Sequence, residues 1–352
     1  MLQQVEVGSI LASRYELQAL LGRGGMGLVF KALDRTLRGE LVALKVLLPG
    51  VDLSPEVLAR FRDEVKLARK VRHKNVCAIF EYQEDGDYPF IVMELVEGTD
   101  LKRALRKVHS LEWEEGFEVA IQVSEGLSAI HEAKIVHRDL KPANITRDKR
   151  DVVRVMDFGI ALSDTHADFT EMGKVVGTID YMSPEQFRGV SLDQRSDIYS
   201  FGIVIYELFT GRVPFRGDVA TIVQKHLTEP PPLHGVAADQ IPPSLVPVLE
   251  RALSKNRNDR FSSATEMSKA LQAARDKMRR DGTDPVSGSG GRLGLTPPRP
   301  RPVAPYPPQA RLLVPALIRA LGSPDRGVRL GAADALAHTP DALARPALEK
   351  AR

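Results

Sequence analysis

Hydrophobic and polar residues first alternate at the period of β-strands and later recur at the period of α-helices. Residues 15–21, 28–34 and 42–45 follow the strand pattern, and residues 90–96 form a more continuous apolar run. Residues 54–71 carry apolar side chains at helical spacing behind a Ser-Pro pair typical of a helix start. The pattern predicts a small antiparallel sheet accompanied by one helix.

The following part of the chain is dominated by helical periodicity. Residues 114–133 repeat apolar positions at helical spacing, and residues 193–202 open a second, strongly apolar helix. After Lys277 the composition shifts to Gly, Ser and Pro, which is typical of a flexible linker over residues 280–310. Helical character returns in residues 311–352. We therefore expect a sheet-rich part, a helical part, a linker and a short helical segment.

Composition places the chain among ordinary globular proteins. Its 352 residues are 43% hydrophobic and 27% charged, with a formal net charge of only +3. Much of the basic excess lies in the linker and tail, so we expect no nucleic-acid groove. The N-terminus lacks a signal-peptide pattern, and no apolar run is long enough for a membrane span. The only cysteine, Cys77, excludes an intrachain disulfide, so we expect a cytoplasmic protein, although a membrane anchor in a longer parent protein stays open.

The densest candidate chemistry lies in Ile-Val-His-Arg-Asp-Leu-Lys-Pro-Ala-Asn at 135–144, followed by Asp-Phe-Gly at 157–159. Moving a phosphoryl group requires an acceptor held in line and a cation that offsets charge on the phosphate oxygens. Asp139 can orient an acceptor hydroxyl and receive its proton, while Asn144 and Asp157 offer oxygen ligands to Mg²⁺. The two segments together predict a phosphotransferase site.

In this order and spacing, the two segments resemble the catalytic and metal loops of protein kinases. Lys141 is similar to the serine/threonine branch of that family and would offset charge on the γ-phosphate. The resemblance, strongest to bacterial Hanks-type serine/threonine kinases, implies an α+β fold with two lobes. A small antiparallel-sheet lobe with one regulatory helix would span residues 15–97, and a larger helical lobe would span residues 98–279. Residues 1–14 would be an N-terminal extension.

A glycine-rich segment, Gly-Arg-Gly-Gly-Met-Gly at 22–27, follows the first predicted strand. Glycine lets backbone amides approach phosphates closely. A dinucleotide-binding unit would continue into a helix and a Walker A loop would end in Gly-Lys-Ser/Thr, but residues 28–34 alternate like a strand. The segment is therefore similar to the kinase loop that covers ATP.

The next strand contains Val-Ala-Leu-Lys at 42–45, similar to the kinase motif whose lysine reaches the α- and β-phosphates. Lys45 then needs a carboxylate partner. Glu64 falls on the apolar stripe of the predicted helix, where an unpaired carboxylate would be costly. Asp63 and Glu56 point away from that stripe, so the sequence predicts a Lys45–Glu64 pair.

The resemblance implies a larger set of residues around ATP. Met93 would border the adenine pocket, and backbone groups of Glu94 and Val96 would bond the adenine edge. Thr146 departs from the apolar residue that is usual beneath the adenine. The implied nucleotide-contacting residues are Leu21, Gly22, Gly24, Gly27, Val29, Ala43, Lys45, Met93, Glu94, Val96, Asn144, Thr146 and Asp157. The implied catalytic residues are Asp139, Lys141, Lys45 and Glu64, with Asn144 and Asp157 as metal ligands.

Regulation is implied by the segment that ends in Ser-Pro-Glu at 183–185. Thr170 lies where bacterial relatives are typically autophosphorylated, and a phosphate there could pair with Arg138 and order the segment. Thr178 is implied to contact Asp139 and shape the acceptor site.

The resemblance also implies four supporting residues. His137 would pack and hydrogen-bond beneath Phe158, and Asp197 would bond the backbone of the catalytic loop. Arg260 would form a buried ion pair with Glu185.

Residues 311–352 resemble one HEAT repeat and the start of another. Such a repeat usually needs neighbours to bury its apolar face. The segment is then part of a longer protein, a helix pair docked on the kinase domain or on a partner protein, or an isolated helical hairpin.

Together these features predict an ATP- and Mg²⁺-dependent enzyme that phosphorylates Ser and Thr in proteins and autophosphorylates in bacterial signal transduction. A nucleotide-binding pseudokinase scaffold that acts through the HEAT-like tail is the main alternative. A small-molecule phosphotransferase is a second one, and a kinase homodimer stays open.

Overall fold

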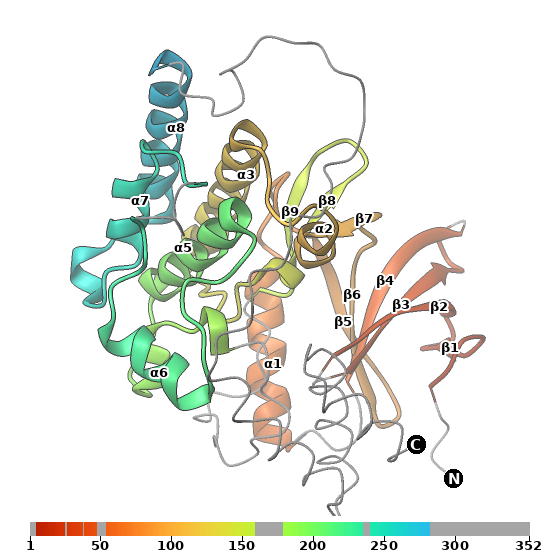
Figure 1. The fold of residues 1–352 in the computed structure, drawn as a ribbon. Helices are drawn as coiled ribbons and strands as arrows, with labels where there is room; N and C mark the ends of the chain where they lie inside the picture. Colours follow the sequence, from red (N-terminus) through yellow and green to blue (C-terminus); the bar gives the residue numbers. More distant parts are fainter. Residues whose placement is uncertain are drawn as a thin grey trace, which may run out of the picture. The chain divides into compact units, whose positions relative to one another are not determined.

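The computed structural model describes residues 5–24, 27–37, 39–47, 54–158, 179–234 and 240–281. All of them belong to the first of the chain's two compact units, Met1–Gly288. The predicted linker, the HEAT-like segment, Thr170 and Thr178 lie outside the described residues. Within these ranges, Figure 1 shows a curved sheet on one side and a group of helices on the other.

Six antiparallel strands form the sheet in the order β1-β2-β3-β4-β6-β5. Side chains along β4 point alternately to the two faces of the sheet, and both faces are buried. Ala43 and Leu47 join the core that contains α1, whereas Val42, Leu44 and Val46 form a second core on the opposite face. The strands are β1 (Ile10–Leu11), β2 (Tyr15–Gly24), β3 (Gly27–Asp34), β4 (Glu40–Leu47), β5 (Ile79–Asp85) and β6 (Tyr88–Glu94).

One helix, α1 (Pro55–Ala68), packs against the sheet on the side that faces the other helices (Figure 1). It begins with Pro at its first position, as the Ser-Pro pair predicted. Its buried residues are Val57, Phe61, Val65 and Ala68, which recur at helical spacing. The predicted sheet with its single helix is confirmed.

A small three-stranded sheet, in the order β7-β8-β9, follows the segment that joins the two parts. Its strands are β7 (Gly98–Asp100), β8 (Ile145–Asp148) and β9 (Val153–Val155). Glycine is required at position 98, because the backbone of β8 passes so close that a Cβ there would lie 2.3 Å from the carbonyl oxygen of Arg147. In the chain, β8 begins directly after the segment at residues 135–144, which holds the candidate catalytic residues.

The larger part is helical and is built around α5 (Gln194–Thr210), which is buried along nearly its whole length. Asp193 caps the start of α5 by accepting from the Arg195 amide, and Gly211 ends it in the left-handed conformation at φ +70°. The other α-helices are α2 (Leu101–Val108), α3 (Trp113–Glu132), α4 (Pro184–Phe187), α6 (Val219–Thr228), α7 (Val246–Ala252) and α8 (Ala264–Asp281). Short 3₁₀ turns are η1 (Pro142–Asn144), η2 (Ile179–Tyr181) and η3 (Arg257–Asp259).

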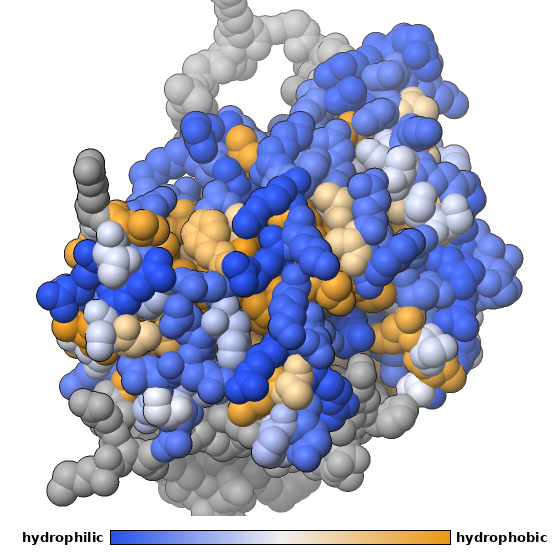
Figure 2. All heavy atoms as spheres, turned by 180° about the vertical axis from the view of Figure 1, so that it is seen from behind, coloured by the Kyte–Doolittle hydropathy of each residue, from blue (hydrophilic) through white to orange (hydrophobic). Residues whose placement is uncertain are grey.

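The predicted α+β fold, a sheet lobe with one helix and a larger helical lobe, is thereby confirmed. Figure 2 shows that the face turned away from the viewer in Figure 1 is largely hydrophilic, with apolar residues exposed in small groups between polar ones. Among the described helices, none combines the length and the hydropathy needed to cross a bilayer.

Candidate active site

Asp197, near the start of α5, binds the backbone of the loop that carries Asp139. Its carboxylate accepts from the backbone amides of His137 at 2.7 Å and Arg138 at 2.9 Å. His131 of α3 adds a third contact, Nε2 to Asp197 Oδ2, at 2.8 Å. Burial raises the pKa of the Asp197 carboxyl, but the hydrogen bonds and the positive potential of His131 outweigh it, so the pKa lies below its ordinary value. The predicted bonding of Asp197 to the loop backbone is confirmed, whereas His131 was not singled out from the sequence.

These bonds hold Arg138 in the left-handed region at φ +68°, which a non-glycine residue rarely adopts. The Arg138 carbonyl accepts from Gln186 Nε2 at 2.8 Å. The loop is therefore fixed from α5 on one side and from α4 on the other. Gln186 was not identified from the sequence either, although it directly follows the Ser-Pro-Glu motif at residues 183–185.

Asp139, the residue assigned to the acceptor hydroxyl, stands at the surface of this loop with 44% of its side chain exposed. Lys141 Nζ lies 2.8 Å from Asp139 Oδ2. Asn144 Nδ2 donates to the Asp139 carbonyl at 2.8 Å and to Oδ2 at 3.2 Å. The loop thus brings an exposed carboxylate, an ammonium group and an amide oxygen together.

Asp157 is brought to the same place by backbone bonds to the catalytic loop. The amide of Met156 donates to the Asn144 carbonyl at 2.8 Å, and His137 Nε2 lies 3.0 Å from the Met156 carbonyl. Burial raises the pKa of the Asp157 carboxyl, but Lys45 and, to a smaller extent, Lys141 outweigh it and lower the pKa. Met156 therefore places Asp157 beside Asn144, the residue whose side chain bonds Asp139.

The predicted Lys45–Glu64 pair is absent from this structure. Lys45 Nζ lies 2.7 Å from Asp157 Oδ1. Glu64 Oε1 lies 3.4 Å from Arg138 Nη1, with 28% of the Glu64 side chain exposed. Lys45 therefore pairs with Asp157, and Glu64 lies near Arg138. Helical periodicity predicts which face of α1 a residue lies on, but it does not predict how far that helix lies from β4.

Most of the other implied nucleotide residues lie on β2, β3, β4 and β6, whereas Val96 follows β6 and Thr146 lies on β8. Strands β2 and β3 are antiparallel neighbours, so the glycine-rich segment joins two strands rather than a strand and a helix. Gly27 lies so close to β4 that a Cβ would meet the Val46 carbonyl oxygen at 2.0 Å. Ala43 and Met93 are paired across β4 and β6. The amide of Glu94 donates to the Ala78 carbonyl at 2.8 Å, and the Glu94 carbonyl accepts a weak hydrogen bond from Cys77 Sγ at 3.6 Å.

A buried ion pair fixes the residues that follow the undescribed segment. Arg260 donates to both carboxylate oxygens of Glu185, at 2.7 and 2.9 Å, and the two side chains are 0% and 5% exposed. Ser196 donates to the same carboxylate at 2.7 Å. The predicted Glu185–Arg260 pair is confirmed, as is the burial of His137, Phe158 and Cys77.

The oxygen atoms available in the cleft suit a hard cation. Asn144 uses its amide nitrogen toward Asp139, which leaves its side-chain oxygen as a ligand, and Asp157 contributes a carboxylate nearby. Among the described residues, no group of three or more His, Cys, Asp or Glu side chains is placed to hold a metal ion by itself. Two protein ligands are nevertheless enough for a magnesium ion that also binds phosphate oxygens.

The sheet lobe, the helical lobe and the grouping of Asp139, Lys141 and Asn144 on one loop have the organisation of a two-lobed phosphotransferase domain. A family model described as a protein kinase domain matches residues 15–273. The chain belongs to the protein kinase family.

Similar proteins support the same assignment. The serine/threonine-protein kinase pkn3 of Myxococcus xanthus is 42% identical over 287 residues, which cover 78% of this chain and 52% of the relative. PknA of Mycobacterium tuberculosis, also a serine/threonine-protein kinase, is 37% identical over 275 residues, 76% of this chain and 63% of the relative. The crystal structure of the Mycobacterium tuberculosis PknI kinase domain matches with a TM-score of 0.63 and 27% identity, covering 77% of this chain and 100% of that one. The chain thus spans between half and two thirds of the length of these two curated relatives.

Proposed function

We propose that this chain is an active serine/threonine protein kinase that transfers the γ-phosphoryl group of ATP to hydroxyl groups of proteins. The observation that carries the proposal is the grouping of Asp139, Lys141 and Asn144 by direct contacts, with Asp157 brought beside them by the bond from the Met156 amide to the Asn144 carbonyl. The kinships with pkn3 and PknA support the serine/threonine class.

Each of these side chains has a role that its contacts support. Asp139 orients the acceptor hydroxyl and receives its proton, which its exposure to the cleft permits. Lys141 offsets charge on the transferred group. Asn144 and Asp157 would hold a magnesium ion, which when bound supplies charge neutralisation at the phosphate oxygens. Lys45 serves the α- and β-phosphates, with Glu64 as the carboxylate that holds it in the nucleotide-bound state.

The nucleotide would lie between β2, β3 and the segment that follows β6. Val29 and Ala43 would cover the base, Thr146 would lie beneath it, and the Glu94 carbonyl and Val96 backbone would bond its edge. Leu21, which is 52% exposed, would become covered by the nucleotide.

Activation by phosphorylation of Thr170, with Arg138 as the partner of the phosphate, remains part of this proposal. The same holds for Thr178 as a contact of Asp139, and for a homodimer or a partner protein that engages the HEAT-like segment. The main competing function is the pseudokinase scaffold. The retention of Lys45, Asp139 and Asp157 in one cleft favours the enzyme.

Transfer of labelled phosphate tests the proposal. The purified chain is incubated with labelled ATP, Mg²⁺ and a generic basic protein, and the products are mapped by mass spectrometry. We expect phosphoserine or phosphothreonine on the basic protein and on the chain itself. Binding of ATP without transfer to either protein would support the scaffold and refute the enzyme.

A further inference from the structure

The peptide unit that joins Arg138 to Asp139 sets the direction in which the Asp139 side chain leaves the loop. The backbone before it is fixed by Asp197, whose carboxylate accepts from the amides of His137 and Arg138. The N–H of the peptide unit, which belongs to Asp139, lies 3.4 Å from His137 Nδ1, a long contact for a hydrogen bond. Its carbonyl accepts from Gln186 Nε2 at 2.8 Å, so the bond from Gln186 is the shorter of these two contacts.

The backbone conformation of Arg138 depends on such bonds. Its φ of +68° lies in the left-handed region, which persists in a non-glycine residue only where the surrounding structure enforces it. Asp197 holds the Arg138 amide, and Gln186 holds the Arg138 carbonyl. Loss of the bond from Gln186 would therefore let the peptide unit turn, and Asp139 would move with it.

The side-chain amide of Gln186 has one orientation. Its Oε1 accepts from the backbone amide of Ser183 at 2.9 Å and from the Ser183 hydroxyl at 3.0 Å. A backbone N–H can only donate, so the Gln186 oxygen must face Ser183 and its NH₂ group must face the Arg138 carbonyl. The two ends of this side chain thus connect Ser183 to the loop that carries Asp139.

The helix that carries Gln186 is itself firmly placed in the helical lobe. Gln186 follows Glu185, whose buried carboxylate accepts from Arg260 and Ser196. Ser183, at the start of α4, is also buried. Because α4 is fixed in this way, Gln186 can hold the neighbouring loop in one position.

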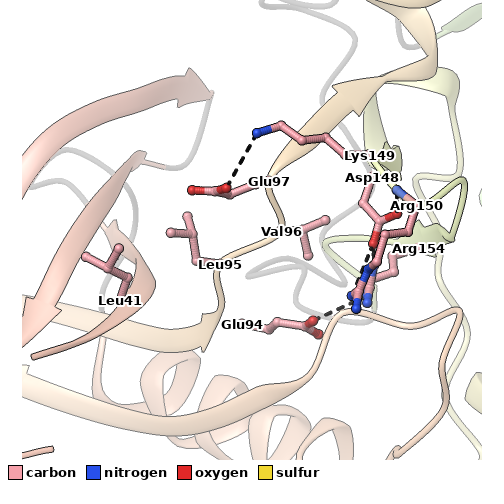
Figure 3. Close-up of a pocket in the computed structure, with 9 residues that line it drawn as sticks. All are labelled: Leu41, Glu94, Leu95, Val96, Glu97, Asp148, Lys149, Arg150 and Arg154. Carbon is pink, nitrogen blue, oxygen red and sulfur yellow. Dashed lines mark hydrogen bonds and ion pairs between the residues drawn. The ribbon is translucent and has the colours of Figure 1, made fainter. Parts of the chain in front are cut away.

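The ion pairs beside the segment that joins the lobes lead to a different place. A hollow of about 490 Å³ lies beside this joining segment, residues 94–97 (Figure 3). On its wall, Arg154 of β9 lies 3.3 Å from Glu94 and 2.8 Å from Asp148. These two pairs tie the joining segment to the β8–β9 hairpin, and neither of them includes Asp139 or its neighbours in the loop.

We propose that Gln186 is a positioning residue for phosphoryl transfer, which holds the Arg138–Asp139 peptide unit so that the Asp139 carboxylate meets the acceptor hydroxyl. The inference rests on the kinase activity proposed above. Gln186 bonds the backbone of the loop, and its effect on the reaction passes through Asp139. A displacement of about 1 Å can lower a rate on the order of 10²-fold, so loss of the bond should lower kcat roughly 10- to 100-fold.

Two substitutions separate this role from the capping of α4. Gln186→Met keeps the length of the side chain and removes both of its contacts. Gln186→Glu keeps an oxygen for Ser183, and Glu is as suitable as Gln at this position of a capping box, but an ionised carboxylate cannot donate to the Arg138 carbonyl. We expect both variants to lose kcat toward a generic basic protein and to keep the KM for ATP. Full kcat in Gln186→Glu would mean that Gln186 is only a cap and would overturn the proposal.

A residue that acts through Asp139 should have no effect once Asp139 is replaced. Gln186→Met in an Asp139→Asn background should therefore leave the residual rate of transfer unchanged. A further loss as large as that in the unmodified chain would show that Gln186 acts independently of Asp139, against the proposal. Gln224→Met and Gln224→Glu, at an exposed position on α6, are the matched controls and should keep the full kcat.

Hydrogen exchange tests the position of the loop without relying on catalysis. Deuterium uptake by residues 137–141 is followed by mass spectrometry in the unmodified chain, in Gln186→Glu and in Gln224→Glu. We expect faster uptake in Gln186→Glu alone, and unchanged uptake in that variant would contradict the proposal. An unmodified chain that transfers no phosphate would refute the proposed kinase activity, whereas the exchange would still decide whether Gln186 holds the peptide unit.

Discussion

Lys45 donates a hydrogen bond to Asp157, with Nζ and Oδ1 2.7 Å apart, and so ties β4 to the segment after β9. This contact uses a carboxylate oxygen that a metal ion would need. Glu64, the expected partner of Lys45, is held by Arg138 instead. Lys45 and Arg138 thus each have a carboxylate within ion-pair distance.

Nucleotide binding should therefore exchange these ion pairs. In a crystal structure with Mg²⁺ and a non-hydrolysable ATP analogue, we expect Lys45 Nζ to leave Asp157 for the phosphates and for Glu64. The phosphates supply the negative charge that Asp157 now supplies, and the metal requires the carboxylate. A complex with metal bound at Asp157 and Lys45 still 2.7 Å from that carboxylate would contradict this prediction.

Replacement of Asp139 by Asn should abolish most of the phosphoryl transfer. Loss of a general base reduces rates by roughly 10²–10⁴-fold, while ATP binding should persist because Asp139 is not assigned to the nucleotide. Initial rates with labelled ATP and the affinity for a fluorescent ATP analogue measure the two effects. Asp63→Asn, at a position 71% exposed on α1, is the matched control and should keep the full rate.

The buried ion pair between Glu185 and Arg260 should contribute strongly to the free energy of unfolding. Arg260→Met leaves the 5% exposed carboxylate of Glu185 without its bidentate partner, and removing one member of a buried pair costs about 3–5 kcal/mol. Urea unfolding measures the loss. Lys66→Met breaks an exposed pair, with both side chains 71% exposed, and should change the unfolding free energy by about 1 kcal/mol or less. Equal effects of the two substitutions would refute the prediction.

His226 should make the folded state sensitive to mild acid. Its ring is buried among Phe187, Tyr199 and Phe215, and Nδ1 lies 3.0 Å from the Tyr199 hydroxyl. Burial, with a smaller contribution from a nearby lysine, lowers the pKa of His226 from 6.5 to about 3. The unfolded chain therefore takes up a proton first, and stability present above pH 6.5 is lost as the pH falls toward 3.

Urea unfolding at pH 7 and pH 5 measures this effect. The protein should lose up to about 2 kcal/mol more between these pH values than a His226→Phe variant does. His234→Phe is the control, because His234 is 79% exposed, and it should keep the full pH dependence. A pH dependence that survives in His226→Phe would exclude this histidine as its source.

The parts of the site that the sequence predicted well are held by local chain geometry or follow from the resemblance to kinases. Asp139 and Asn144 lie on one loop, so their proximity follows from their spacing. The roles of Asp197 and of the Glu185–Arg260 pair came from resemblance to kinases, and the structure contains both contacts.

The parts that it could not predict depend on how separate elements approach one another. Glu64 was placed on the correct flank of α1, but its choice between Lys45 and Arg138 depends on the position of that helix relative to β4. The hollow beside the joining segment combines Leu41 with Arg150, which are far apart in the sequence and share no motif. His131 contacts Asp197 only because α3 and α5 pack together.

The three bonds to Asp197 all originate in the helical lobe, from His131, His137 and Arg138. A rotation of the sheet lobe would therefore move Lys45 and leave the backbone around Asp139 unchanged. Cleft opening would then act mainly on the donor side, and would reach the acceptor side through Arg138, whose guanidinium lies 3.4 Å from Glu64 of α1.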